Sequence, residues 1–318
     1  MMQFDRLTIG RQAKELGYVR DTFEKVCRLV DVLSFIGNDP ALSGSLALKG
    51  GTAINLAFFD LPRLSIDIDL DYAKDMPREA MMEDRVRITD HISKYMSAAG
   101  YTLHPRSKQY HALDSFVYEY INAGGMRDNL KIEINYMLRC HVLPAEHRVV
   151  EFPWNDTALT VFCINPIEIF AAKAVALLNR AAARDLFDMN NLQKNGLMDT
   201  GTRNVFRQSI QFYTAIASEQ IPEHFSFDAI DGITERKIRT DLTPVLRRAS
   251  HFNLREAQDN VKRYLEDLLL PEGDLSFWKE FSKGKYRPEL LFDDPEILER
   301  IRNHPMALWK CGKNAETI

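Results

Sequence analysis

The sequence has little of what usually marks a secreted or membrane protein. Its four cysteines are far apart and lack the paired spacing of zinc or redox sites. They are Cys27, Cys140, Cys163 and Cys311, and we expect reduced thiols rather than a disulfide framework. No apolar run approaches the roughly 20 residues that span a bilayer, and the first residues contain no apolar core of signal-peptide length. These absences argue against a membrane protein and favour a cytoplasmic location.

A strong charge of either sign is also missing. The 318 residues carry a formal net charge of -4, so no global positive field indicates nucleic-acid binding. A polyanionic partner would need a local basic patch, and residues 236–255 are rich enough in arginine and lysine to form one, although a solvated surface is the commoner explanation. We find no internal repeat and no low-complexity segment. At this length, two globular domains are expected.

Chemically informative residues are concentrated in residues 46–72. A short buried strand is expected over residues 46–48, and Gly50 and Gly51 follow it as a tight turn. Thr52 is a suitable N-cap for the apolar helix that comes next. Exposed backbone N–H groups at such a turn favour phosphate. Taken alone, however, the motif more often marks a strand-to-helix turn without a ligand.

Carboxylates alternate with apolar side chains over residues 64–72. The alternation predicts a strand with Asp67, Asp69 and Asp71 on one face. Three carboxylates in a row repel one another unless a cation lies among them. A solvated edge strand could tolerate this row, and a magnesium or manganese ion bound by the carboxylate oxygens is the alternative.

A further acidic residue, Glu133, lies between two isoleucines in the segment 130–137. This segment is expected to be a strand beside the aspartate strand. By itself Glu133 could simply face solvent. Next to Asp67 and Asp69 it becomes the natural third carboxylate of a two-metal site.

The second half of the sequence is mainly helical in pattern. Residues 167–189 are alanine-rich, and we predict one long helix with Lys173, Arg180 and Arg184 on one side and Asp185 and Asp188 near its end. These cations could form a solvated face with an Arg–Asp ion pair, or a cationic wall that faces metals and a triphosphate. Further helices are predicted over residues 18–36, 79–99, 203–218, 228–239, 254–269 and 274–283.

Together these features resemble the nucleotidyltransferase superfamily that includes DNA polymerase β. Its signature is a glycine turn, an Asp-x-Asp strand and a later acidic residue. Within it the chain is similar to the AbiEii branch, the toxins of type IV toxin–antitoxin systems, to which the MenT toxins also belong. Three passages support this resemblance. They are LKGGTAINLAFFDLPRLSIDIDL, Lys173 with the later motif RDLFD, and the tail YRPELLFDDPEILERIRNHPMALWK.

The resemblance implies an α+β fold in two domains. Residues 1–160 would form a polymerase β-like nucleotidyltransferase domain with a mixed sheet and helices. Residues 161–318 would form a mainly α-helical domain that completes the active-site cleft. The implied reaction is metal-dependent transfer of NMP from an NTP to an acceptor hydroxyl, with Mg2+ or Mn2+ as the cofactor. In related toxins the acceptor is the 3′ end of tRNA, and an AbiEi-like antitoxin is an expected partner.

The resemblance and the charge pattern also indicate site residues. The expected triphosphate ligands are Gly50, Gly51, Thr52, Lys173, Arg180 and Arg184. The expected metal ligands are Asp67, Asp69 and Glu133, the last from the wider superfamily. The expected catalytic residues are Ser65, Asp67, Asp69, Lys173 and Asp185, whereas Asp71 is not needed by the motif. Two other classes stay open: a transferase that acts on a small molecule or protein, and a non-catalytic module of this fold that binds a partner.

Overall fold

The computed structural model describes residues 4–153, 158–270 and 275–317, so the first residue of the predicted helix 274–283 lies outside the described part. The chain divides into two compact units. The sheet unit comprises Met1–Arg139, Ala145–Ile164 and Pro244–Ser250, and the helical unit comprises Cys140–Pro144, Asn165–Thr243 and His251–Ile318. The predicted boundary near residue 160 assigns Pro244–Ser250 to the helical domain, whereas this segment belongs to the sheet unit.

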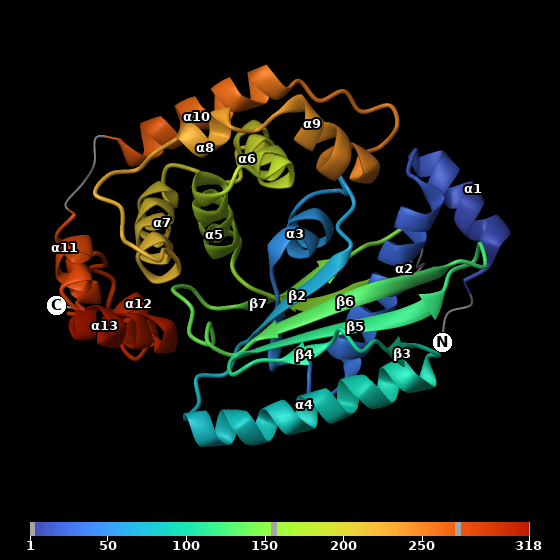
Figure 1. Cartoon of the computed structure of the whole chain (residues 1–318), viewed down its shortest axis with the longest axis horizontal. Helices are drawn as coiled ribbons and strands as arrows, with labels where there is room; N and C mark the ends of the chain where they lie inside the picture. Colours follow the sequence, from blue (N-terminus) through green and yellow to red (C-terminus); the bar gives the residue numbers. More distant parts are fainter. Residues whose placement is uncertain (1–3, 154–157, 271–274, 318) are drawn as a thin grey trace. The chain divides into compact units, whose positions relative to one another are not determined.

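One mixed sheet of eight strands forms the centre of the sheet unit (Figure 1). The strands are β1 (Leu46–Leu48), β2 (Asp67–Tyr72), β3 (Thr102–Leu103), β4 (Lys108–Gln109), β5 (Leu113–Ile121), β6 (Arg127–Asn135), β7 (Glu146–Val150) and β8 (Leu159–Cys163). Their order is β3-β5-β6-β2-β1-β8-β7, with β4 paired to β5. Strand β2 runs antiparallel to β1 and parallel to β6, and β1 runs parallel to β8. The predicted mixed sheet is therefore confirmed.

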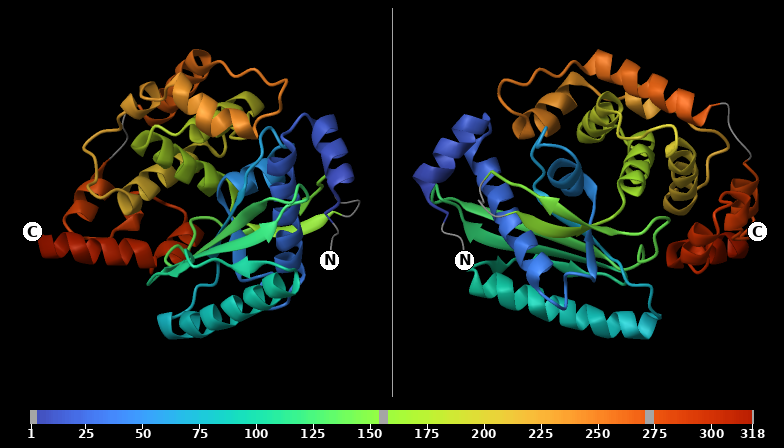
Figure 2. Two further views of the ribbon diagram at one scale, coloured as in Figure 1. Left: turned by 45° about the vertical axis from the view of Figure 1, so that its right-hand side comes forward. Right: turned by 180° about the vertical axis from the view of Figure 1, so that it is seen from behind.

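The alternation along β2 separates the two faces of this sheet. The helices of the sheet unit are α1 (Arg6–Leu16), α2 (Arg20–Asn38), α3 (Gly50–Ala53), the π-helix η1 (Ile54–Phe58) and α4 (Arg78–Ala98). Figure 2 shows α2 crossing one face of the sheet. The apolar residues of β2 point to that face, where the Tyr72 hydroxyl donates to Asp84 of α4. Asp67, Asp69 and Asp71 therefore lie on the opposite face.

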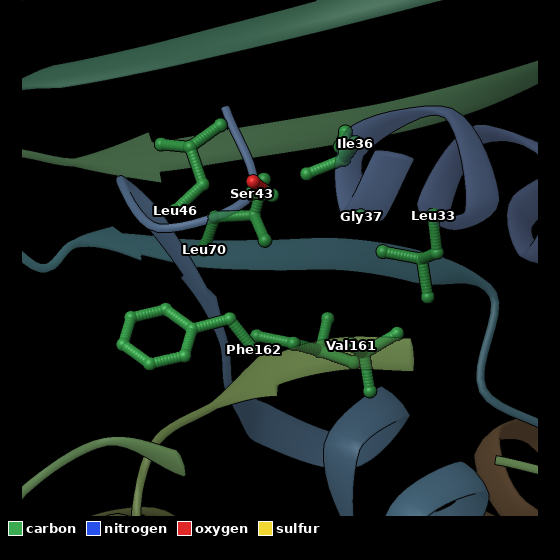
Figure 3. Close-up of a pocket in the computed structure, with 9 residues that line it drawn as sticks. Leu33, Ile36, Gly37, Ser43, Leu46, Leu70, Val161 and Phe162 are labelled. Carbon is green, nitrogen blue, oxygen red and sulfur yellow. The ribbon is translucent and has the colours of Figure 1, made fainter. Parts of the chain in front are cut away.

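Helix α2 packs closely on the sheet because of Gly37. A Cβ at this position would collide with the carbonyl oxygen of Thr160 in β8. Figure 3 shows Leu33 and Ile36 of α2 with Leu70 among the residues around a small apolar gap next to this contact. The mainly apolar walls of the gap make it part of the core rather than a ligand site.

The predicted strand over residues 64–72 begins later than expected. Strand β2 starts at Asp67, and the Leu64 N–H donates instead to the carbonyl oxygen of Val245 (2.8 Å). Arg63 forms an isolated bridge with Leu246. The segment before β2 is therefore held by Pro244–Ser250, which returns to the sheet unit more than 180 residues later in the chain.

Helices account for nearly all regular structure after β8. They are α5 (Pro166–Asn179), α6 (Ala183–Asn195), α7 (Arg203–Ala217), α8 (Asp228–Asp231), α9 (Glu235–Lys237), η2 (Ile238–Leu242), η3 (Thr243–Val245), α10 (Leu254–Leu269), α11 (Ser276–Ser282), η4 (Pro288–Leu290), α12 (Pro295–Ile301) and α13 (Pro305–Thr317). The prediction of one helix over 228–239 is wrong, because the chain leaves the helix after Gly232 and the Thr234 side chain caps a new one. Within the described residues, no helix combines the length and apolarity needed to cross a membrane.

The prediction of one helix over residues 167–189 is also wrong. Helix α5 ends before Arg180, whose backbone is extended, and α6 begins at Ala183 (Figure 2). On one continuous helix, Lys173 and Asp185 would lie about 18 Å apart along the axis. The break allows their side chains to pair at 2.9 Å. Tertiary contacts of this kind override the high helix propensity of the alanine run.

Candidate active site

The turn after β1 is packed directly onto the aspartate strand. Gly50 has a φ of 67°, in the left-handed region that favours glycine. A Cβ on Gly50 would lie 2.7 Å from Oδ2 of Asp69. A Cβ on Gly51 would lie 2.7 Å from Nη2 of Arg63 and 3.0 Å from Oγ of Ser65. Side chains at these two glycines would therefore displace groups that line the predicted site.

Thr52 has a different place from the predicted one. The N-cap residue of α3 is Lys49, without a side-chain cap, so the prediction that Thr52 caps the helix is wrong. The helix begins at the glycine turn itself, which puts Thr52 inside its first turn. Thr52 is fully buried, and its hydroxyl donates to the backbone carbonyl oxygen of Asp67 (2.5 Å). This hydrogen bond ties the glycine turn to β2.

The register between β2 and β6 brings the three predicted metal ligands to one face of the sheet. Asp69 lies opposite Glu133, and Asp67 lies opposite Lys131. Residues that oppose one another across paired strands point to the same side, as do residues two apart on one strand. All three carboxylates are partly exposed. The prediction that the strand of Glu133 lies beside the aspartate strand is confirmed.

Lys131 lies among these carboxylates and is not one of the predicted site residues. Its Nζ is 2.8 Å from Oε2 of Glu133. Burial lowers the pKa of Lys131, but its hydrogen bond to Glu133 and the charges of Glu133, Asp67 and Asp69 outweigh burial and raise the pKa. The sequence did contain a signal, since Lys131 stands two residues before Glu133 and so shares its face of the strand.

The remaining aspartate of β2, Asp71, has a structural role. It is buried and accepts a hydrogen bond from Nζ of Lys49 at 2.5 Å. Burial raises the pKa of Asp71, and the positive charge of Lys49 opposes that effect. The ion pair joins the residue before Gly50 to the aspartate strand, so both ends of the glycine turn are fixed to β2.

The chemistry of the donor set fits a hard divalent cation. Asp67, Asp69 and Glu133 offer only carboxylate oxygens, which magnesium and manganese prefer. In the described part of the chain, however, no three His, Cys, Asp or Glu side chains stand in positions to hold one ion. The carboxylate of Glu133 is directed to Lys131. An ion bound by Glu133 would therefore compete with that lysine for the carboxylate.

In the helical unit, Lys173 is held in a buried cluster of ion pairs. Its Nζ lies 2.9 Å from Oδ1 of Asp185 and 3.2 Å from Oδ2 of Asp188. Arg180 Nε lies 3.1 Å from the second oxygen of Asp185. The Lys173 side chain is 11% exposed, and both carboxylates are buried. Asp188, expected near the end of the helix but not among the site residues, is a second partner of Lys173, since it lies three residues after Asp185 and thus on the same side of α6.

The structure thus groups the predicted residues by unit. In the sheet unit it brings together Gly50, Gly51, Thr52, Ser65, Asp67, Asp69 and Glu133. In the helical unit it brings together Lys173, Arg180 and Asp185. The prediction that Lys173, Arg180 and Arg184 share one helix is wrong, because Arg180 lies at the break and Arg184 lies on α6.

The mixed sheet presents a glycine turn and paired aspartates on one face and is followed in the chain by helices, which is the arrangement expected for a nucleotidyltransferase. The family model described as "Nucleotidyl transferase AbiEii toxin, Type IV TA system" matches residues 35–281. The match covers well over half of the chain, which therefore belongs to the AbiEii family of nucleotidyltransferase toxins. The predicted family is confirmed.

A solved structure supports the same fold. MenT4, a nucleotidyltransferase toxin from Mycobacterium tuberculosis H37Rv, is similar to this chain with a TM-score of 0.64 and a sequence identity of 16%. The similarity covers 96% of this chain and 99% of MenT4. A comparison with curated protein sequences gave no significant match.

Proposed function

We propose that this protein transfers a nucleoside monophosphate from an NTP to the 3′ end of a tRNA, with release of pyrophosphate, in a reaction that depends on Mg2+ or Mn2+. The observation that supports this most is the register that sets Asp69 opposite Glu133, beside Asp67 and against Gly50. Family membership supports nucleotidyl transfer. The tRNA acceptor is inferred from the toxins that the sequence resembles.

Asp67, Asp69 and Glu133 would hold the metal through their carboxylate oxygens. Bound there, magnesium would neutralise phosphate charge and lower the pKa of the attacking hydroxyl. The chain itself fixes these carboxylates. Pairing of β2 with β6 sets their spacing, the Thr52 hydroxyl anchors the backbone of Asp67, and the missing side chain of Gly50 leaves room for Asp69.

The glycine turn is the proposed triphosphate site. With no side chains at Gly50 and Gly51, the backbone N–H groups of the turn can approach phosphate oxygens closely. The Thr52 hydroxyl is occupied by Asp67, so Thr52 would contribute its backbone rather than its side chain. The Ser65 hydroxyl lies against Gly51, and we assign it to the same phosphate-binding surface.

We assign Lys173 to neutralise triphosphate oxygens, as its match to the family motif implies, with Arg180 and Arg184 as further positive charge. Phosphoryl transfer depends on charge and positioning more than on covalent help from the protein. Asp185 accepts hydrogen bonds from both Lys173 and Arg180. It is therefore proposed as a positioning residue that orients these two cations.

The proposal is tested by incubating the purified protein with total RNA, magnesium and each labelled NTP separately. We expect label in a tRNA-sized band, and loss of this label in Asp69→Asn. The matched control is Asp128→Asn, because Asp128 lies on β6 in an ion pair with Lys25 of α2 and outside the proposed site. Absence of labelled RNA with every NTP would contradict the proposal, and label in a small molecule or protein would favour the alternative transferase.

An AbiEi-like antitoxin is the proposed partner, and the cytoplasm, which holds tRNA and NTPs, is the proposed place of action. The type IV toxin–antitoxin family supports this pairing. Expression of the protein should arrest bacterial growth, whereas expression of Asp69→Asn should not. Equal arrest by both proteins would show that toxicity does not depend on the carboxylates.

A further inference from the structure

The face formed by Asp67, Asp69 and Glu133, called here the carboxylate face, contains a cation of its own. Lys131 is opposite Asp67 in the sheet register and two residues before Glu133 on β6. Its ammonium contacts the Glu133 carboxylate at 2.8 Å, and the two side chains are 39% and 28% exposed. Solvent and ions can therefore reach this ion pair.

A divalent ion and the Lys131 ammonium would need the same carboxylate. Three neighbouring carboxylates repel one another unless a positive charge lies among them. Lys131 supplies that charge in the structure, and the described residues include no ready-made group of three metal ligands. Lys131 contacts one oxygen of Glu133, so a divalent ion at this residue would compete with the ammonium for the charge of the same carboxylate.

We propose that Lys131 is a displaceable internal counterion of the carboxylate face. In the metal-free protein it holds Glu133 and offsets the repulsion among the carboxylates. A divalent ion binds by taking Glu133 from Lys131, so the lysine lowers metal affinity while it stabilises the metal-free fold. Lys131 is in this sense a positioning residue. The inference rests on the proposed function in one respect, namely that the carboxylate face binds Mg2+ or Mn2+.

The test is direct measurement of Mn2+ binding, by the EPR signal of the free ion, in the full-length protein and its variants. Lys131→Met should bind Mn2+ about three- to fivefold more tightly than the wild type, at the upper end of the range expected for a partly exposed ion pair. Lys131→Arg keeps the charge and should stay within about twofold of the wild type. Glu133→Gln should bind Mn2+ more weakly.

Lys25→Met provides the matched control. Lys25 also pairs with a carboxylate of β6, Asp128, at 2.7 Å, and Asp128 precedes Glu133 by five residues. Both lysine-to-methionine variants lose an ion pair, so both should melt at a lower temperature without metal. Added Mn2+ should restore the melting temperature of Lys131→Met but not that of Lys25→Met.

Unchanged or weaker Mn2+ binding by Lys131→Met would overturn the inference. If the Mn2+ affinity is unchanged and the KM for NTP rises, Lys131 is a phosphate ligand instead. If Lys131→Met does not fold, Lys131→Gln is measured in its place, and unchanged or weaker Mn2+ binding by that variant overturns the inference. Nucleotide incorporation is measured separately in the wild type. If the wild type incorporates no nucleotide but Lys131→Met binds Mn2+ more tightly, the proposed function is rejected and this inference is retained.

Discussion

The sheet unit and the helical unit each contain a cluster of carboxylates and cations, but the two clusters balance their charge differently. On the carboxylate face, three partly exposed carboxylates share Lys131. In the helical unit, two buried carboxylates share Lys173 and Arg180. The first cluster has an excess of negative charge that a metal can relieve, whereas the second is balanced and fixes the break between α5 and α6. We therefore expect substitutions on the carboxylate face to lower the rate of transfer. Substitutions in the helical cluster should lower both the rate of transfer and the stability.

Removal of an aspartate from the carboxylate face should have the largest effect on activity. Asp67→Ala or Asp69→Ala is expected to lower the rate of nucleotide transfer by about a thousandfold or more, because each removes a proposed metal ligand. The melting temperature should not fall, because like charges repel one another on this face. Initial rates with labelled NTP and circular dichroism melts measure the two quantities. Retained incorporation in either purified variant would contradict the metal-dependent account.

Removal of the lysine from the helical cluster should reduce stability in addition to nucleotide transfer. Lys173→Met leaves Asp185 and Asp188 buried without their shared ammonium, which is expected to lower the free energy of unfolding by about 3–5 kcal/mol. Urea denaturation measures this change. The control is Lys262→Met, whose ion pair with Asp231 lies on the surface of the same unit and should contribute nothing measurable. Equal losses of unfolding free energy in the two variants would show that the buried ion pairs of Lys173 contribute no more to stability than an exposed pair does.

A pair of glycine substitutions separates strain from interference with the site. Gly50→Ala and Gly125→Ala each place alanine at a positive φ, which should cost about 1–2 kcal/mol in both variants. A Cβ at Gly125 meets nothing within 4 Å, whereas one at Gly50 lies 2.7 Å from the carboxylate of Asp69. We expect kcat/KM to fall at least about tenfold further in Gly50→Ala. Equal kcat/KM values would show that the approach of Gly50 to Asp69 has no role in transfer.

The smallest effect on transfer is expected at Thr52, which acts through stability. Thr52→Val keeps the shape of the side chain but loses the hydrogen bond to the carbonyl oxygen of Asp67, at a cost of about 1–3 kcal/mol in the free energy of unfolding. Thr52→Ser retains the hydroxyl and should recover most of this loss. Urea denaturation compares the two variants. If serine is as destabilising as valine, the methyl group of Thr52 contributes as much to stability as its hydroxyl, and the hydrogen bond to Asp67 is not the dominant role of this residue.

The sequence predicted the carboxylate face well because the relevant patterns are local. Alternation marked the aspartate strand, and two flanking isoleucines marked the strand of Glu133. The pairing partner of Glu133 depends on strands that lie more than 60 residues apart in the chain, so its exact register came only from the structure. Lys131 was overlooked because a lysine on a strand usually faces solvent, and only the register shows the carboxylates around it.

Prediction failed where distant contacts decide the local structure. Alanine propensity favoured one helix over residues 167–189, but Lys173 and Asp185 can pair only if that helix is broken. The return of Pro244–Ser250 to the sheet unit has no local signal either, because it depends on backbone hydrogen bonds to the residues before β2. Thr52 matched the usual N-cap preference, yet the helix already begins at Gly50.

The central claim, that the carboxylate face performs metal-dependent transfer, is tested most directly by single-turnover incorporation of labelled NTP into tRNA during a magnesium titration. Wild-type protein should show no incorporation in EDTA and a rate that rises to saturation with Mg2+. Asp69→Asn should remain folded and show no incorporation at any Mg2+ concentration. Incorporation in EDTA, or a wild-type rate in Asp69→Asn, would contradict the account.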